Sequence, residues 1–316
     1  MKRYFPEIDG LRAFAVLAVI INHFNKGILP NGYLGVDIFF VISGYVITSS
    51  LRKEDSKSFW EFILNFYERR IKRLLPVLIT FILITSIIIC LFNRLPSITL
   101  RTALTALLGL SNIYLYNEST DYFSENTALN PFTHTWSLGV EEQFYFIFPI
   151  LVYLSGFNRG TKKGSYNLAI LLYIFAIPSL ISFIYLYPLN QPAAYFLMTS
   201  RFWEMSTGSL LYLYRQTDHL SKLILNKIPS SLIFLIIICI FYLPGKYASL
   251  STISIVLLTA LLIISFKKDT FIFSLITNEL ALFIGKISYS LYLWHWAVLA
   301  ISLWTIGINY KTLPFQ

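Results

Sequence analysis

Arg12 and His23 stand eleven positions apart in a stretch that is otherwise almost wholly apolar. On an α-helix, eleven residues return the chain to within about 20° of its starting direction and advance it by about 16.5 Å. The spacing therefore predicts one helix face with a cation at one end and a titratable imidazole at the other. Asp9 precedes Arg12 by three residues and can pair with it. Ionisable groups at membrane depth are costly, so this face is a candidate for function. The plainer alternative is an interfacial cap and a histidine that hydrogen-bonds a neighbouring helix.

A carboxylate, Asp37, lies at the start of the next apolar stretch, within the sequence Gly-Val-Asp-Ile-Phe-Phe. Only a short loop separates this stretch from His23, so we expect the two side chains to come within reach of each other. A carboxylate beside an imidazole fixes its tautomer and raises its basicity. The alternative is that Asp37 caps a helix near the membrane interface.

Arg70 and Arg73 precede a third apolar stretch and fall on one face of a predicted helix. Clusters of this kind commonly set membrane topology and interact with anionic lipid. Guanidinium groups also match the geometry of phosphate oxygens. A topology determinant and a phosphate clamp are both open interpretations of this pair.

Three more polar clusters interrupt apolar stretches at helical spacing. The first includes two adjacent glutamates at the entrance to a predicted membrane span, which packing alone does not explain. For the cluster that contains His134, the alternative is a solvated interfacial turn. For Arg201 and Glu204, the alternative is a structural intramembrane ion pair. The third forms a single polar stripe on a buried helix. The clusters are His134, Ser137, Glu141 and Glu142; Arg201 and Glu204; and Ser288, Tyr292 and His295.

Membrane-spanning helices must position these residues. The chain has 316 residues, of which 56% are hydrophobic and 13% charged, and its mean hydropathy is +0.65. Soluble domains carry about 25% charged residues, so the composition predicts an all-α, polytopic integral membrane protein. We then attribute the net charge of +9 to an excess of Lys and Arg on the cytoplasmic face, and not to a nucleic-acid-binding surface. Cys90 and Cys239 lie in apolar runs, which argues against a disulfide framework or a metal site.

About ten apolar runs are long enough to cross a hydrocarbon core of ~30 Å, within a single membrane domain that covers residues 1–316. Lys2 and Arg3 predict a cytoplasmic N-terminus, and the basic residues of 52–73 predict a cytoplasmic amphipathic segment. Charges in later loops conflict with ten plain crossings, so the topology of 93–139 stays open. One solution is that 99–116 does not cross fully. The predicted spans lie near 11–29, 34–51, 74–92, 99–116, 140–157, 167–187, 194–214, 228–244, 248–266 and 281–306.

Several motifs are absent from the sequence. It contains no Gly-x-Ser-x-Gly elbow, no phosphate-binding or dinucleotide glycine loop and no His/Cys set at metal-ligand spacing. Hydrolytic, nucleotide-driven and metal-dependent mechanisms therefore have no positive support. A transporter or flippase of a glycan or lipid precursor is an alternative function, although the inverted repeats common in transporters are not evident. A third possible function is a membrane scaffold whose charged residues are paired and take no part in chemistry.

Six blocks, in this order, resemble the membrane-bound acyltransferase 3 family. The similarity is greatest to the bacterial members that O-acylate surface polysaccharides, such as lipopolysaccharide O-antigen. Any one block is weak, but six in register over residues 4–296 are specific. Longer members carry a further helix and an extracytoplasmic SGNH-type esterase-like domain, and this chain ends before either, so a truncated C-terminus is one expectation. The blocks are Arg12-x10-His23; Gly-Val-Asp37-Ile-Phe-Phe with Ser43-Gly44; Arg70-x-x-Arg73-x-x-Pro76; the run from His134 to Tyr145, which contains Trp136; Arg201-x-x-Glu204; and Ser288-Tyr-x-Leu-Tyr-x-x-His295.

The resemblance implies a cytoplasmic acyl-CoA donor, acetyl-CoA by default, and no metal. The implied acceptor is a hydroxyl of a surface polysaccharide or a lipid-linked glycan. Arg70 and Arg73 would hold the donor's phosphates at the cytoplasmic mouth, and Arg12 would orient the same donor or gate the pore through Asp9. The expected location is the bacterial inner membrane.

The resemblance also implies that His23 is a general base, which removes the acceptor proton as the thioester is attacked. Asp37 or Glu142 would orient its ring. Direct transfer is the simpler route, and acyl intermediates on His23 or Ser43 stay open. Hydrogen-bond donors for the developing oxyanion are expected among Trp136, Ser137, Ser288 and Tyr292.

Overall fold

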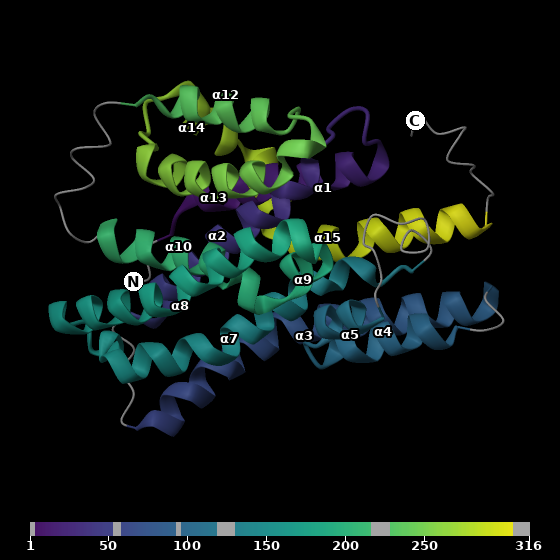
Figure 1. The fold of residues 1–316 in the computed structure, drawn as a ribbon, viewed down its shortest axis with the longest axis horizontal. Coiled ribbons are helices and arrows are strands. Elements are labelled where there is room, and N and C mark those ends of the chain that lie inside the picture. The colour runs from purple at the N-terminus through teal and green to yellow at the C-terminus, as the bar shows by residue number, and fades with distance from the viewer. Residues whose placement is uncertain (1–3, 53–57, 93–95, 119–129, 216–227, 306–316) are drawn as a thin grey trace. The chain divides into compact units, whose positions relative to one another are not determined.

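The computed structural model of the chain describes residues 4–52, 58–92, 96–118, 130–215 and 228–305 (Figure 1). Helices account for 86% of these residues, and the described ranges contain no strand. The prediction of an all-α fold is therefore confirmed. The chain divides into two compact units, one from the described parts of 1–50 and 204–292, the other from those of 51–203 and 293–309.

The first unit contains the N-terminal helical hairpin and a group of helices from the C-terminal third, among which α12, α13 and α14 pack on one another or on α1 (Figure 1). Two helices, α10 (Met198–Arg215) and α15 (Glu279–Thr305), contribute residues to both units. The other elements of the first unit are α1 (Pro6–Phe24), η1 (Gly32–Leu34), α2 (Gly35–Leu51), α12 (Ser230–Ile240), η4 (Gly245–Tyr247), α13 (Ala248–Ser265) and α14 (Phe271–Ile276).

The second unit is built around α7, which packs against α3, α4, α5, α8 and α9. Its elements are α3 (Phe59–Phe92), α4 (Ser97–Leu107), α5 (Ser111–Asn117), η2 (Thr133–Thr135), α7 (Trp136–Ser155), η3 (Phe157–Arg159), α8 (Lys162–Leu189) and α9 (Gln191–Phe196).

Four helical stretches in the described ranges are long and apolar enough to cross a membrane: Gly32–Leu51, Phe59–Phe92, Lys162–Leu189 and Gly245–Ser265. The count of about ten spans is therefore not confirmed. Several predicted spans are interrupted, and 99–116 breaks into α4 and α5 around Gly109. Its φ of 68° lies in the left-handed region, which glycine adopts without a steric penalty and which ends the helix.

The four stretches differ in how much of their apolar surface is buried. Only 28% of the most apolar window is buried in α3 and in α8, against 78% in Gly32–Leu51. Exposed apolar side chains on α3 and α8 suit contact with hydrocarbon, whereas α2 belongs to the protein core. Length, composition and exposure together support an integral membrane protein.

The basic segment predicted over 52–73 does not form a separate helix. From Phe59 onward it is continuous with the apolar run that follows, because α3 passes through Pro76 to Phe92. The hydroxyl of Thr80 donates to the Pro76 carbonyl at 2.8 Å within the same helix. Residues 53–57, with Lys53 and Lys57, lie outside the described ranges, as do Lys2 and Arg3.

Two glycines allow α2 and α10 to cross at close range in the first unit. A Cβ on Gly44 would lie 1.8 Å from the Met205 carbonyl oxygen, and one on Gly208 would lie 1.9 Å from that of Val41. The Ser209 hydroxyl donates to the Gly44 carbonyl at 3.1 Å across the same crossing. Small residues at helix contacts let backbones approach without relying on the hydrophobic effect.

We expect Gly208→Ala to destabilise the protein by about 1–3 kcal/mol, because the added methyl group must push the two helices apart. Gly245→Ala is the matched control, since a Cβ at Gly245 meets nothing within 4 Å. The midpoint of thermal unfolding in detergent is measured for both variants. Equal midpoints for the two would contradict the close crossing.

Candidate functional site

The hairpin of α1 and α2 positions the imidazole and the carboxylate predicted to act together. His23 is half-buried in the last turn of α1, and Asp37 is 4% exposed in the first turn of α2. The Asn22 amide donates to the carbonyls of Leu29 and Pro30 at 2.8 and 2.9 Å, which folds the connecting loop back onto α1. The first turn of α2 thereby lies beside the second half of α1.

The other end of the same α1 face carries the predicted ion pair. The Arg12 guanidinium lies 3.8 Å from the Asp9 carboxylate, and Tyr4 donates its hydroxyl to Asp9 at 2.9 Å. Both charged side chains are mostly buried, with 17% and 14% exposure. This part of α1 therefore holds a partnered cation where the sequence predicts one.

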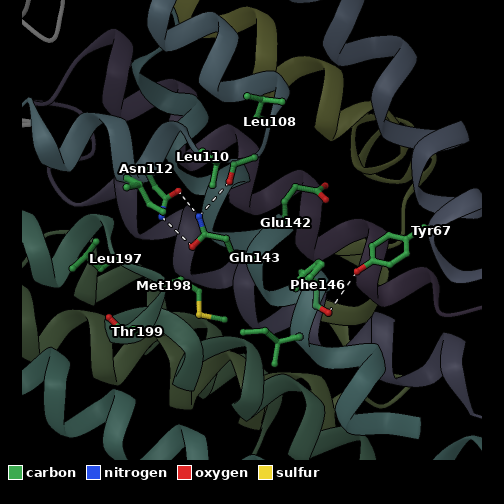
Figure 2. A pocket seen from close by; sticks show the side chains of 13 residues that line it. Tyr67, Leu108, Leu110, Asn112, Glu142, Gln143, Phe146, Leu197, Met198 and Thr199 are labelled. Carbon is green, nitrogen blue, oxygen red and sulfur yellow. Dashed lines mark hydrogen bonds between the residues drawn. The ribbon is translucent and has the colours of Figure 1, made fainter. Parts of the chain in front are cut away.

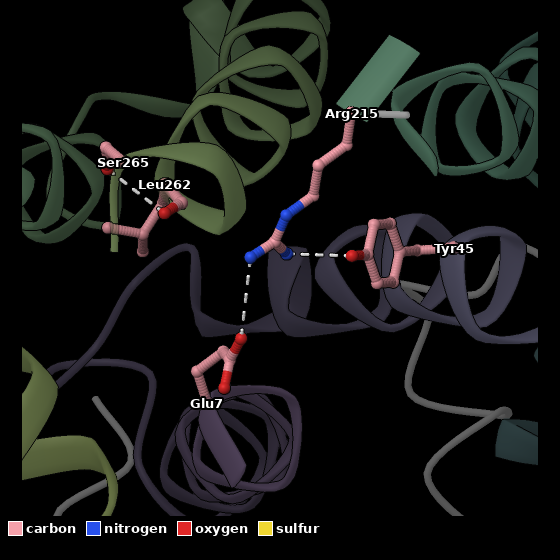
Figure 3. A network of polar contacts seen from close by, with 5 residues as sticks. All are labelled: Glu7, Tyr45, Arg215, Leu262 and Ser265. Carbon is pink, nitrogen blue, oxygen red and sulfur yellow. Dashed lines mark hydrogen bonds and ion pairs between the residues drawn. The ribbon is translucent and has the colours of Figure 1, made fainter. Parts of the chain in front are cut away.

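A second cation, Arg215, lies in the first unit and was not predicted from the sequence. It donates from Nη1 to the Tyr45 hydroxyl at 2.8 Å, and Nη2 lies 4.0 Å from Glu7 Oε1 (Figure 3). Its guanidinium carbon is 5.7 Å from the centre of the Phe5 ring. These contacts tie the last residue of α10 to α1 and α2.

The second unit contains a cavity of about 590 Å³ between α3, α5, α7 and the start of α10 (Figure 2). Its volume falls in the range of small-molecule sites, about 300–1,000 Å³. Most of its wall is aliphatic or aromatic, and the Glu142 carboxylate is exposed into it. Apolar wall residues include Leu108, Leu110, Ile113, Phe146, Leu197 and Met198.

Two amide side chains fix one wall of this cavity (Figure 2). The Gln143 amide donates to the Gly109 carbonyl at 3.2 Å and to Asn112 Oδ1 at 2.8 Å, and the Asn112 amide donates to the Phe196 carbonyl at 2.9 Å. A Cβ on Gly139 would lie 2.5 Å from Asn112 Oδ1, so a glycine there lets α5 approach α7. In the sequence, this network was indicated only by polar residues such as Asn112 within the predicted span 99–116.

Arg70 is packed against α7, while Arg73 is exposed. The Arg70 guanidinium carbon lies 4.1 Å from the centre of the Tyr145 ring, and the Tyr145 hydroxyl donates to the Glu141 carboxylate. Arg70 also acts electrostatically on Glu142. A cation, two carboxylates and the cavity are thus gathered along α3 and α7.

His134 is fully buried and is therefore not solvated, whereas Glu142 of the same cluster is exposed. Its ring packs edge-on against those of Phe81 and His295, at 5.8 and 5.5 Å between centres. His134 lies in η2, outside the four candidate spans, and burial, with a smaller contribution from His295, lowers its pKa well below the ordinary value. We therefore expect it to stay neutral. The Ser137 hydroxyl donates to the His134 carbonyl at 3.3 Å.

Arg201 is 2% exposed and is enclosed by aromatic rings from three helices. Its guanidinium carbon lies 4.9, 5.4 and 5.8 Å from the ring centres of Tyr195, Phe183 and Trp136, and Nε donates to the Tyr195 carbonyl at 3.2 Å. Stacking on aromatic faces is a favourable environment for a planar guanidinium. Arg201 therefore holds α10, whose start forms part of the cavity wall, against α7, α8 and α9.

The predicted residues fall into two groups, each described within its own unit. Ser43, Glu204, Ser288 and Tyr292 are all buried in the first unit, where the Tyr292 and Phe39 rings are 6.2 Å apart. No cluster of three or more His, Cys, Asp or Glu that could hold a metal occurs in the described ranges. The first group is Asp9, Arg12, His23, Asp37, Ser43, Glu204, Ser288 and Tyr292; the second is Arg70, Arg73, His134, Trp136, Ser137, Glu141, Glu142, Arg201 and His295.

Comparison with known proteins identifies the class. The acyltransferase-domain family, acyltransferase 3, matches residues 5–311. A candidate O-acetyltransferase of Staphylococcus aureus strain COL is 33% identical over 317 residues, which cover 94% of this chain and 51% of the relative. The O-acetyltransferase OatA of Staphylococcus aureus strain NCTC 8325 is 33% identical over 313 residues, with the same coverage. No solved structure shows significant similarity to the chain.

These matches extend over nearly all of a helical, apolar chain of the kind expected for a membrane acyltransferase. The chain belongs to the acyltransferase 3 family. It spans about half the length of the curated relatives that it matches.

We expect Gln143→Met to destabilise the protein by about 1–3 kcal/mol, since the Gly109 carbonyl and Asn112 Oδ1 would each lose a donor. Phe146→Leu is the control, because its side chain is 65% exposed and lies one turn along the same helix. Thermal unfolding of both variants in detergent provides the measurement. A Gln143→Met midpoint equal to that of the parent would show that the amide network does not hold α5 to α7.

Proposed function

We propose that the chain is an integral-membrane O-acyltransferase domain. It would move an acyl group, acetyl by default, from acyl-CoA to a hydroxyl of a cell-surface polysaccharide or glycolipid. Membership of the acyltransferase 3 family and the names of the S. aureus relatives support this proposal. The observation that carries it is the α1–α2 hairpin, with His23 half-buried in the last turn of α1 and Asp37 buried in the first turn of α2.

In the proposed reaction, the acceptor hydroxyl oxygen attacks the thioester carbonyl carbon while the imidazole of His23 takes the hydroxyl proton. The new C–O bond forms, the C–S bond breaks, and the CoA thiolate leaves with the proton from the imidazolium. Direct transfer needs no acyl-enzyme. Asp37 would hold the ring in the tautomer that leaves one nitrogen available as the base.

The arginines would bind the donor. Arg73 is exposed and Arg70 is held over the Tyr145 ring, so both can present guanidinium donors to phosphate oxygens. Arg12, partnered by Asp9, would orient the same donor at the cytoplasmic end of α1. This assignment includes the bacterial inner membrane as the location, with the N-terminus on the cytoplasmic side.

We expect His23→Ala to lower acyl transfer by about a hundred- to ten-thousandfold at unchanged membrane levels, because the hydroxyl proton loses its acceptor. Release of free CoA thiol from acetyl-CoA, in the presence of surface polysaccharide, is the readout. Phe24→Ala is the matched control, since this neighbouring side chain is 43% exposed. Acetyl-CoA turnover that survives His23→Ala would remove the general-base role. Absence of both turnover and acetyl-CoA binding in the parent would favour a transporter or flippase.

The double variant Arg70→Ala/Arg73→Ala should raise the KM for acetyl-CoA about tenfold or more, with a smaller change in kcat, because uniform binding of the donor's phosphates is lost. Arg69→Ala changes an exposed arginine on the same helix and controls for net charge. Steady-state kinetics at saturating acceptor separates the two parameters. A KM equal to that of the Arg69→Ala variant would contradict the phosphate clamp.

A further inference from the structure

Glu142 is a carboxylate without a hydrogen bond or ion pair among the described residues. Figure 2 shows its side chain on the cavity wall, pointing away from the bonded Asn112–Gln143 pair and lying on the side of Tyr67. The neighbouring Glu141 already accepts the Tyr145 hydroxyl. Glu142 therefore provides hydrogen-bond acceptor capacity that the protein itself does not use.

The cavity wall and this carboxylate together restrict what can bind. A lipid tail would place hydrocarbon against an ionisable carboxylate, which is costly without a donor. A free anion would be attracted to Arg70, which lies outside the cavity lining, and not to the Glu142 carboxylate inside it. No group of three or more His, Cys, Asp or Glu that could hold a divalent cation occurs in the described ranges. A neutral, thin molecule that alternates methylene groups with N–H or O–H donors matches both the apolar wall and the single acceptor.

Arg70 lies next to this cavity. It is one helical turn beyond Tyr67, a cavity-lining residue, and acts electrostatically on Glu142. A ligand that spans both places would carry its phosphates at Arg70 and a neutral, amide-bearing chain in the cavity. Acyl-CoA has this order of groups, with phosphates followed by a pantetheine arm of two amides, a hydroxyl and methylenes.

We propose that the cavity between α3, α5, α7 and the start of α10 binds the pantetheine arm of the donor, and that Glu142 accepts a hydrogen bond from an amide or hydroxyl of that arm. The inference rests on the proposed acyl-CoA donor. It assigns to Glu142 the positioning of the donor arm in the second unit. The arm's apolar groups would contact Leu110, Ile113 and Leu197, which line the cavity.

The test compares two ligands on the detergent-purified protein. Acetyl-CoA contains the arm, whereas adenosine 3′,5′-bisphosphate has the nucleotide and two of the three phosphates without it. Leu110→Trp fills the cavity from a side chain that is 42% exposed, and Leu104→Trp adds the same bulk to a side chain on α4 that is 59% exposed and outside the cavity. Dissociation constants are measured by equilibrium dialysis. Glu142→Leu, which is of similar size but has no hydrogen-bond acceptor, is the second variant if Leu110→Trp fails to fold.

We expect Leu110→Trp and Glu142→Leu each to weaken acetyl-CoA binding about tenfold or more, the loss of roughly one charge-assisted hydrogen bond or its equivalent in contacts. Binding of the bisphosphate should stay unchanged in both, and Leu104→Trp should change neither ligand. If the parent binds and turns over acetyl-CoA but the cavity variants weaken both ligands equally or neither, the arm-site inference is overturned and the proposed function stands. If the parent binds no acetyl-CoA, the donor assignment and the inference fall together.

Discussion

Polar groups inside a low-dielectric helical protein are costly unless they find partners, and three networks of the described structure supply such partners within the chain. The Asn112–Gln143 amides satisfy each other and two backbone carbonyls, and Arg201 is enclosed by three aromatic rings. In the first unit, Arg215 joins Tyr45 and approaches Glu7. Each network links helices that are distant in sequence, so the polar groups define the packing as much as the apolar core does.

The same constraint gives meaning to the polar groups that are not absorbed into structure. Arg73 is exposed on α3, and Glu142 faces the cavity and has no hydrogen bond among the described residues. Such groups are available to a ligand. The buried His134 and Arg201 instead pack against aromatic and imidazole rings and have a structural role. The structure therefore separates motif residues that can contact a ligand from motif residues that stabilise the fold, which the sequence motifs alone do not distinguish.

The sequence was sufficient to predict the features that depend on local spacing. The helical hairpin of α1 and α2, the Asp9–Arg12 pair and the all-α class follow from periodicity and composition. It was not sufficient for contacts between distant positions. Arg215 finds Glu7 across the chain, and Gln143 meets an amide on a different helix, neither of which a hydropathy pattern indicates. The run 99–116 is divided into α4 and α5 at Gly109, in line with the expectation that it does not cross fully, but the backbone angle that ends the helix there is not visible in its hydropathy.

Transfer of the acyl group across the bilayer is tested most directly in sealed vesicles that contain the protein in one orientation. Labelled acetyl-CoA is supplied outside, on the side of the N-terminus, and the polysaccharide acceptor is enclosed inside. If the acyl group crosses the bilayer, the label appears on the enclosed acceptor while free CoA thiol accumulates outside. Acetylation that occurs only when donor and acceptor share a compartment would contradict transfer across the bilayer.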